Sequence, residues 1–414
     1  MKILVSAFAC HPKWGSEDGV GWGWVTTLAR HHEVHVIART ARKPAIDPAL
    51  EEQPMPNLHF HYIDPPEWML FWRRGPIGGM AYAILWQLFA FVAAVKVVRK
   101  HAPFNIIQHL TYGNLWLPSY LFLIPGTYIW GPVGGGVVPA SFAADYRKLE
   151  RVVEALRLIA LRYFRWINLP ILLNMFRARI ILARTDDTIS FLPSWAKSKT
   201  RLLPETALNL SLFPFDSWQR QSVCQQTIFT IVYAGRILSL KNLHLAIKAF
   251  VTLLERFPHL KGRFRFDIYG DGVYLPVCRE QAGDEDGRSV VFHGFIDRRV
   301  LLERLRHAHL FVHLSAKDTA ATAPMEAMAL GLPVICLNCG GMGNLVDESC
   351  GVLLSPHTPS RIIAETMEVI SKLAEDREHL LRLSIAARQK IEQSFDWGRR
   401  IQQYDEIVRE RCTV

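Results

Sequence analysis

Cysteine is scarce in this chain and is not arranged as metal sites are. The seven cysteines among 414 residues are scattered singly, and only Cys336 and Cys339 have the spacing of a metal-ligating pair. No second pair exists to complete a four-ligand zinc site, so that class of site is excluded. Isolated cysteines are typical of a reducing compartment, and we expect a cytoplasmic protein.

The sequence also lacks the composition of a disordered chain and the pattern of a signal peptide. Half of the residues are hydrophobic, which suits a globular protein. The opening stretch, MKILVSAFACHP, is too short and too weakly apolar for a signal peptide. Because 414 residues exceed one ordinary core, the length predicts two domains.

Acidic residues are under-represented in the first half of the chain. Residues 1–225 hold 24 Lys and Arg against 15 Asp and Glu, whereas residues 226–414 hold 24 against 23. Nucleic acid, anionic lipid or an anionic substrate would each explain this excess. The sequence shows no recognisable nucleic-acid-binding module, so we expect no nucleic-acid partner and favour an anionic membrane surface or substrate.

One long apolar window needs its own interpretation. PIGGMAYAILWQLFAFVAAVKVV (Pro76–Val98) has no charge before Lys96 and is about long enough to span a bilayer. Its glycine pair, Gln87 and aromatic residues also fit a helix half buried in a core and half lying on a membrane. We prefer this second interpretation. The basic amphipathic region Leu149–Arg177 fits a membrane surface or a solvated helix face equally well.

The order of apolar runs predicts an α/β protein. KILVSAF is a strand followed by a glycine-rich loop, the helix GWVTTLARHH and the strand EVHVIART. From Thr227 a second series begins, with the strands TIFTIVYAGR, FRFDIYGDG, SVVFHGF, HLFVHLS and PVICLN. We predict two doubly wound, Rossmann-like domains over residues 1–203 and 227–395, joined by an interdomain connection over 204–226. Residues 396–414 should form a C-terminal helix that packs back on the first domain.

The segment YAGRILSLKN carries the pattern of a phosphate site. Gly235 permits a tight exit from the strand, and Arg236 and Lys241 flank a short loop before a helix. Two cations beside a helix N-terminus can bind a phosphate or diphosphate, although both could equally be solvated surface charges.

The stretch SAKDTAATAPMEAMALGLPV holds two carboxylates, Asp318 and Glu326, among small residues. Pro324 can be the first helical residue, which would place Glu326 in the first turn near the positive end of the helix dipole. Ala323 is a poor cap, so the first backbone N–H groups would be free for a ligand.

Together these segments resemble the family 4 retaining glycosyltransferases. The resemblance rests on the two carboxylates followed by EAMALGLPV, on AGRILSLKN and on GGMGNLVDESCGVLLSP, and it is strongest over 231–355. GSEDGVGWGWVTTLARHHEVHVIAR and WGPVGGG resemble a bacterial subgroup that makes polysaccharides and glycans. The resemblance implies the GT-B fold, in which two Rossmann-like domains face each other across a cleft.

The resemblance also implies roles for single residues. The cations matching Arg236 and Lys241 bind the diphosphate of a nucleotide-sugar donor, and Glu326 holds the ribose. The earlier acid contacts the donor sugar, and here it is Asp318 where the family usually has Glu. His109 matches a histidine near the donor sugar. Further donor contacts are implied for Gly15, Gly235, Gly294, Thr322, Ala323 and Met325.

No metal or other cofactor is expected. Asp284 and Asp286 in GDEDG have a metal-like spacing, but they lie in a polar loop that we interpret as a solvated turn. HHEVH (His31–His35) has metal-like residue types at a helix–strand junction, and we interpret it as separate core and surface histidines. Arg236, Lys241 and a helix end would then stabilise the leaving diphosphate without a metal.

We therefore expect a retaining, metal-independent glycosyltransferase. It would move a sugar from a UDP- or GDP-sugar to a saccharide acceptor. The basic first half and its apolar helix suggest that this acceptor is lipid-linked and that transfer takes place at the inner membrane face. Two alternatives stay open: a sugar-nucleotide epimerase of the same fold, and a non-catalytic sugar-nucleotide-binding partner.

Overall fold

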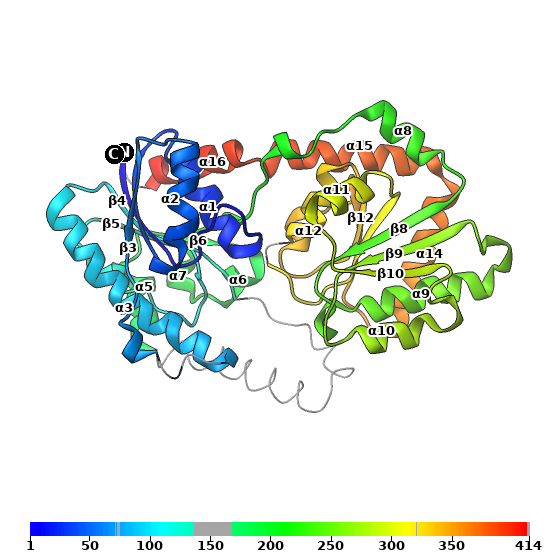
Figure 1. Ribbon diagram of the computed structural model, residues 1–414, viewed down its shortest axis with the longest axis horizontal. Helices are drawn as coiled ribbons and strands as arrows, with labels where there is room; N and C mark the ends of the chain where they lie inside the picture. The colour runs from blue at the N-terminus through cyan, green and yellow to red at the C-terminus, as the bar shows by residue number, and fades with distance from the viewer. Residues whose placement is uncertain (71, 73–74, 136–167, 320, 412–414) are drawn as a thin grey trace. The chain divides into compact units, whose positions relative to one another are not determined.

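The computed structural model describes residues 1–70, 72, 75–135, 168–319 and 321–411, which divide into two compact units. Among the described residues, the first unit comprises those up to Gly135 with 168–207 and 397–411, and the second comprises 208–396. Each unit is built around one parallel sheet covered by helices (Figure 1). The predicted α/β class with two Rossmann-like units is confirmed.

The sheet of the first unit is parallel throughout and has the order β3-β2-β1-β4-β5-β6-β7. Its strands are β1 (Lys2–Ala7), β2 (Glu33–Ala38), β3 (Leu58–Tyr62), β4 (Ile106–His109), β5 (Thr127–Val133), β6 (Ile180–Ala183) and β7 (Thr200–Leu202). The chain reverses its direction of winding between β1 and β4. At such a switch point, loops diverge at the carboxyl ends of the strands and leave room for a ligand.

Helices cover both faces of this sheet. One face is covered by α1 (Ser16–Leu28), α2 (Lys43–Glu52) and α16 (Trp397–Arg411). The other carries α3 (Gly75–His101), α5 (Leu169–Arg177) and α7 (Ser194–Lys197), while α6 (Asp186–Phe191) follows β6 (Figure 1). Of the predicted basic region Leu149–Arg177, only α5 and the residue before it lie within the described residues.

The first helix starts earlier than the sequence predicts. The expected glycine-rich loop is largely helical, because α1 begins at Ser16 and includes Gly19, Gly21 and Gly23. A side chain at Gly21 would overlap the backbone of Ala9, and one at Gly23 would overlap the ring of Trp397. These glycines therefore serve close packing of the helix rather than flexibility of a loop.

The helix α3 is the only one among the described residues that is long and apolar enough to cross a membrane. One face nevertheless packs into the core of the first unit through Tyr82, Trp86, Ala90, Ala94 and Val97. The opposite face leaves apolar side chains exposed: Ile84, Leu88 and Val92. The predicted core half of this helix is confirmed, and contact of its other half with a membrane stays a prediction.

The second unit repeats the doubly wound plan with the strand order β10-β9-β8-β11-β12-β13. Its strands are β8 (Phe229–Ala234), β9 (Phe264–Tyr269), β10 (Val290–Gly294), β11 (Leu310–His313), β12 (Val334–Leu337) and β13 (Gly351–Leu354). On one face lie α9 (Leu243–Arg256), α10 (Leu275–Ala282) and α14 (Pro359–Glu375); on the other lie α8 (Ser217–Cys224), α11 (Arg298–Arg306), α12 (Thr322–Ala329) and α15 (Arg377–Ser394) (Figure 1). A short helix, α13 (Met342–Leu345), follows β12.

Most of the segment predicted as an interdomain connection belongs to the second unit. The helix α8 buries Arg220, Val223 and Cys224. The guanidinium of Arg220 donates to the hydroxyl of Ser384 on α15 and to the carbonyl oxygens of Ala308 and His309. The boundary between the units lies at 207/208, and the second boundary lies at 396/397.

Replacing Gly23 by alanine should destabilise the first unit. The added methyl group would overlap the Trp397 ring between α1 and α16, and overpacking of this kind costs about 1–3 kcal/mol. The matched control is Gly79→Ala in α3, where an added methyl group meets no atom and should stabilise the helix by roughly 0.5–1 kcal/mol. Thermal unfolding of both variants checks the pair, and equal shifts would contradict this packing.

Candidate functional site

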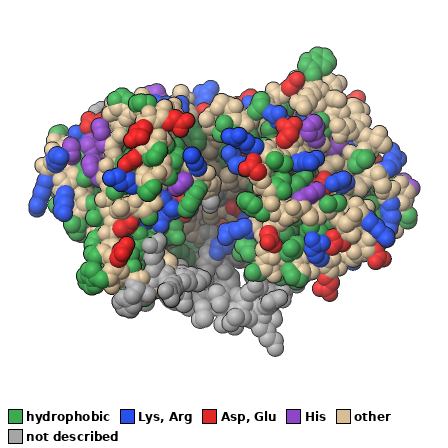
Figure 2. All heavy atoms as spheres, in the orientation of Figure 1, with side chains coloured by type: hydrophobic (Ala, Val, Ile, Leu, Met, Phe, Trp, Pro, Cys, Tyr) green, Lys and Arg blue, Asp and Glu red, His purple; other side chains and the backbone are tan. Residues whose placement is uncertain are grey.

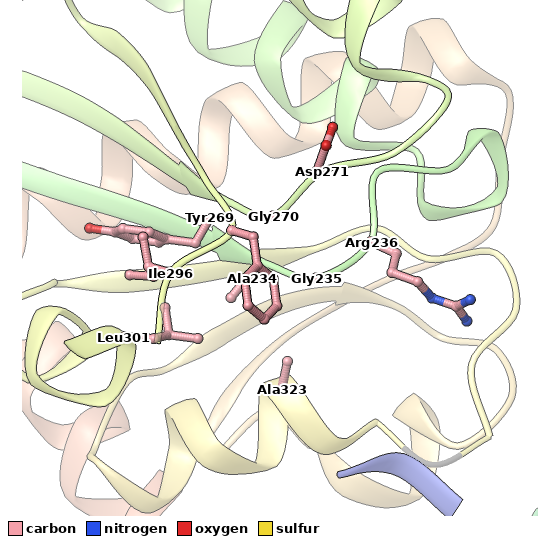
Figure 3. Close-up of a pocket in the computed structure, with 10 residues that line it drawn as sticks. Ala234, Gly235, Arg236, Tyr269, Gly270, Asp271, Ile296, Leu301 and Ala323 are labelled. Carbon is pink, nitrogen blue, oxygen red and sulfur yellow. The ribbon is translucent and has the colours of Figure 1, made fainter. Parts of the chain in front are cut away.

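A cavity of about 320 Å³ opens in the second unit where β8, β9 and β10 end (Figure 3). It lies beside the switch point between β8 and β11, where a doubly wound sheet leaves room for a ligand. Its wall is formed by Ala234, Gly235, Arg236, Tyr269, Gly270, Asp271, Phe295, Ile296, Leu301 and Ala323. Of the predicted donor-binding residues, Gly235, Arg236 and Ala323 therefore share one cavity.

The two sides of this cavity differ in chemistry. Tyr269, Ile296 and Leu301 gather at one side, and Arg236 extends at the other (Figure 3). The Arg236 side chain is exposed and makes no ion pair with any residue that the structure describes. An apolar wall next to an unpaired guanidinium suits a ligand with a flat ring at one end and an anionic group at the other.

Glycines shape the floor of the cavity by letting two loops approach each other. A side chain at Gly270 would overlap the carbonyl oxygen of Gly235, and one at Gly272 would overlap that of Ile237. Both glycines are thus explained by backbone packing between the loops after β8 and β9. Gly294, also a predicted donor contact, ends β10 with a φ of +69°, which favours glycine.

Asp318 lies at the centre of a buried polar cluster. Its Oδ2 is 2.6 Å from Nζ of Lys241 and 2.8 Å from Nε2 of His313, and its Oδ1 accepts from the backbone N–H of Ala321 at 3.2 Å. The structure thus brings together two of the predicted site residues, Asp318 and Lys241, as an ion pair. Side chains of both are only 16% exposed, so the pair is poorly screened by solvent.

The ionisation of this cluster follows from its contacts. Burial alone would raise the pKa of Asp318, but the hydrogen bond and charge of His313 and the charge of Lys241 outweigh it and hold that pKa well below its usual range. Burial lowers the pKa of His313, with Asp318 opposing. At neutral pH the Asp318 carboxylate is therefore ionised.

Backbone contacts fix the loop that carries Asp318. The carbonyl oxygen of Asp318 accepts from the N–H of Gly341 at 2.7 Å. A side chain at Gly340 would overlap that same carbonyl group. The Gly340–Gly341 pair after β12, part of the motif behind the family resemblance, therefore allows the Asp318 loop to pack closely against it.

Glu326 is buried and paired, but not in the position that the sequence predicts. The expected helix start at Pro324 is wrong: α12 begins at Thr322, so Glu326 lies in its second turn. Its Oε1 accepts two hydrogen bonds from Arg298, from Nε at 3.0 Å and from the terminal nitrogen Nη2 at 2.6 Å. Burial raises the pKa of Glu326, and Arg298 opposes that rise.

The start of α12 lacks a side-chain cap. Ala321, the residue before the helix, adopts a left-handed φ of 45° and provides no side-chain cap. Thr322 and Ala323 form the first turn, and Ala323 lines the cavity. Met325, predicted as a donor contact, has its side chain in the apolar core, 2% exposed. Only its backbone could therefore contribute to a site.

The remaining predicted site residues lie in the first unit. Gly15 caps α1 from an exposed position, and His109 is the fully buried last residue of β4. Neither ring nitrogen of His109 has a side-chain partner among the described residues. Burial, and next the charge of Arg184, lower the pKa of His109 to about 4, so its imidazole is neutral at pH 7.

A buried ion-pair network surrounds this end of the first sheet. Arg184 contacts Glu17 at 3.0 Å and Glu205 at 2.7 Å, and Glu17 also accepts from the N–H of Tyr112 at 2.7 Å. Burial would lower the pKa of Arg184, but Glu205 and Glu17 outweigh that effect. The network joins the start of α1 to the loop after β4.

Sequence reasoning missed three charged or titratable partners in these clusters. His313 ends β11 five residues before Asp318, Arg298 starts α11, and Arg184 follows β6. Only the position at a strand end could have drawn attention to His313 and Arg184.

In the GDEDG loop, Asp286 pairs with Arg279 at 2.7 Å and the buried Glu285 pairs with Lys261 at 2.8 Å, so that turn is less solvated than predicted.

The site lies within the part of the chain that matches a known family. Residues 215–390 match the family model "Glycosyl transferases group 1". Over 169 residues the chain is 28% identical to a glycogen synthase of Mycobacterium tuberculosis, covering 40% of this chain and 39% of that protein. It is 30% identical over 179 residues to the putative colanic acid biosynthesis glycosyltransferase WcaL of Escherichia coli, covering 41% and 42%. The matches thus span about two fifths of these curated relatives.

The similarity of fold extends over the whole chain. Anabaena HepE in complex with UDP superimposes with a TM-score of 0.60, covering 99% of this chain and 100% of that one at 16% identity. Two consecutive Rossmann-like units of this kind make the GT-B fold, as the sequence predicts.

Removing the Arg236 side chain should weaken nucleotide binding without destabilising the protein. Arg236 is exposed and makes no ion pair among the described residues, and loss of a charge-assisted hydrogen bond costs about 1.5–3 kcal/mol, or roughly tenfold to a hundredfold in affinity. The comparison is Arg236→Ala with Arg382→Ala, an exposed arginine on α15, using calorimetric titration with UDP and GDP. Equal affinities in the two variants would exclude Arg236 from the site.

Replacing His109 should flatten the acid side of the stability profile. Its folded pKa of about 4 lies below the unfolded value, so the unfolded chain binds a proton that the folded chain does not. Stability present above pH 6.5 is lost as the pH falls toward 4, by at most about 1.4 kcal/mol per pH unit. Denaturant unfolding of wild type, His109→Gln and the exposed control His31→Gln at pH 7, 6 and 5 tests this. If His109→Gln and His31→Gln give the same slope, the buried neutral state of His109 is refuted.

Proposed function

We propose that this protein is a retaining glycosyltransferase that moves a sugar from a nucleotide-sugar donor to a saccharide acceptor. The observation that carries the proposal is that the family match and the cavity coincide in the chain. The region that matches group 1 glycosyl transferases, 215–390, contains every residue of the cavity after β8, β9 and β10. The fold similarity to HepE, whose structure holds UDP, supports a UDP-sugar as the first donor to test.

The chemistry of the cavity walls favours one orientation of a bound donor. Its base would lie against the apolar wall formed by Tyr269, Ile296 and Leu301. Its diphosphate would lie toward Arg236 and the uncapped first turn of α12, where a guanidinium and free backbone N–H groups favour anions. Glu326, held by Arg298, would accept hydrogen bonds from the ribose hydroxyl groups.

The chemistry requires stabilisation of the leaving group. As the bond between the sugar C1 and the diphosphate oxygen breaks, negative charge grows on the diphosphate, and Arg236 and Lys241 would stabilise it as fixed cations in place of a metal. The acceptor hydroxyl forms the new bond to C1 on the face that the diphosphate leaves, which retains the configuration. Its proton passes to the leaving phosphate oxygen, so no protein nucleophile is needed.

Asp318 would position this machinery as well as contact the sugar. Its carboxylate holds the ammonium group of Lys241 at 2.6 Å, so the lysine is oriented before a donor binds. The side chain is one methylene shorter than the glutamate usual in the family. The close packing of Gly340 and Gly341 against its backbone holds the loop in place.

The acceptor and the membrane form the second part of the proposal. The first half carries the basic excess, and α3 exposes the apolar face of Ile84, Leu88 and Val92. Cationic and apolar groups together favour an anionic bilayer surface, which would bring a lipid-linked saccharide to a cytoplasmic peripheral enzyme. The similarity to WcaL supports a role in cell-surface polysaccharide synthesis.

A donor panel and one acid substitution test the proposal. One nucleotide sugar should raise the melting temperature of the purified protein more than the others and should be transferred or hydrolysed. Asp318→Asn should lower turnover roughly a hundredfold, as for loss of other fixed electrostatic groups, with less effect on nucleotide binding, and Asp318→Glu should retain more activity.

Three outcomes would contradict a transferase. Conversion of a UDP-sugar without acceptor into its epimer would identify an epimerase. Nucleotide-sugar binding without turnover, with full function of Asp318→Asn in the cell, would identify a non-catalytic partner subunit. Absence of both turnover and stabilisation with every UDP- and GDP-sugar would reject the sugar-nucleotide site itself.

A further inference from the structure

Four histidines from three elements gather on one face of the first sheet. His35 lies on β2, His59 and His61 lie on β3, and His101 is the last residue of α3, which covers that face. His35 pairs in register with His59, and side chains two positions apart on a strand share a face, so His61 joins them. Figure 2 shows histidine side chains grouped at the left of the view, over the first unit.

Three of these histidines converge closely enough to share one ion. The Nδ1 of His35 lies 3.0 Å from the Nε2 of His61. One ring nitrogen from each of His35, His61 and His101 lies within 4.8 Å of the other two. In a tetrahedral zinc site each nitrogen is about 2.0–2.1 Å from the metal, which places neighbouring ligands roughly 3.3 Å apart. Small changes of side-chain torsion would bring this set to that geometry.

An outer carboxylate orients the buried member of the set. The Nε2 of His35 lies 3.1 Å from Oε1 of Glu33, and Glu33 is held in turn by Lys2 at 3.0 Å. A carboxylate favours the tautomer in which Nε2 of His35 carries the proton, so the lone pair of Nδ1 faces His61. Metal-ligating histidines usually have such a carboxylate partner on the nitrogen that does not bind the metal.

We propose that His35, His61 and His101 bind a Zn²⁺ ion, with water at the fourth position. Imidazole ligands suit zinc, nickel and copper, and three histidines with one open position form a tetrahedral zinc site. His61 and His101 are half-buried, which leaves a path for the ion and for water. The set Glu33, His35 and His59 also lies within 4.8 Å, but it would use the exposed His59 and remove the orienting role of Glu33.

The ion would act on structure rather than on sugar transfer. It joins β2, β3 and the end of α3, and His101 is followed by the segment that leads into the start of β4. His109, the predicted donor contact, lies at the carboxyl end of β4, whereas His101 precedes the start of that strand. The inference therefore stands apart from the proposed glycosyltransferase activity and from the expectation that transfer needs no metal.

The motif HHEVH contributes one ligand, not a site of its own. His31 is exposed, and His32 pairs with Asp405 of α16 at 2.9 Å, as separate surface and core histidines should. His35 differs from that interpretation, because β3 and α3 bring it the partners that its own sequence segment lacks.

Metal binding to the untagged full-length protein tests the site. After dialysis against a chelator, titration with Zn²⁺ should give one ion per chain and raise the melting temperature. Titration with Co²⁺ should give the intense visible absorption of tetrahedral cobalt. Both readouts are independent of glycosyltransferase activity, so failure of either proposal leaves the other standing.

Matched variants decide which side chains bind the ion. His101→Gln and His61→Gln should each weaken Zn²⁺ binding at least about a hundredfold, and Glu33→Gln about tenfold to a hundredfold. His31→Gln is the control and should bind as the wild type does. Variants at half-buried positions are chosen so that folding survives, and circular dichroism verifies it. No bound Zn²⁺ in the wild type, or unchanged affinity in both His101→Gln and His61→Gln, would overturn the proposal.

Discussion

The second unit depends on the ties between the loop after β8 and the loop after β11. Lys241 pairs with Asp318, Asn242 donates its side-chain amide to the carbonyl oxygen of Leu314, and the N–H of Ala316 donates to Leu240. These loops flank the switch point of the sheet, where winding alone would leave them free to diverge. Because they are tied, the cavity beside β8 has a fixed wall, and Arg236 on that wall makes no ion pair with the described residues.

The same constraint explains why glycines are concentrated around this site. The loops after β8 and β9 approach through Gly270 and Gly272, and the loop after β12 approaches Asp318 through Gly340. A side chain at any of these positions would separate two pieces of backbone that must touch. The motif glycines therefore build the site through the packing of its loops, and the ligand meets the surface that results.

Sequence reasoning predicted the repeated β–α pattern well, because long apolar runs ending in glycine are strong signals. It predicted the approach of Arg236, Gly235 and Ala323 to one cavity. It did not predict the short edge strands β7 and β13. It also missed the partners His313 and Arg298, because side-chain pairing across elements depends on packing distances that spacing along the chain does not contain. The early start of α1 was missed because several glycines close together in a sequence are typical of a loop, whereas here they allow the helix to pack closely.

The first unit is built from segments at both ends of the described chain, which are synthesised at different times. Its sheet is made from the N-terminal residues, but its core includes Tyr404 and Ile401 of α16, and the hydroxyl of Tyr404 donates to the side chain of Gln108 on β4. Chains emerge from the ribosome N-terminus first. The second unit, 208–396, is therefore synthesised before the residues of α16 that belong to the core of the first unit. The core of the first unit therefore cannot be completed until the residues of α16 have been made.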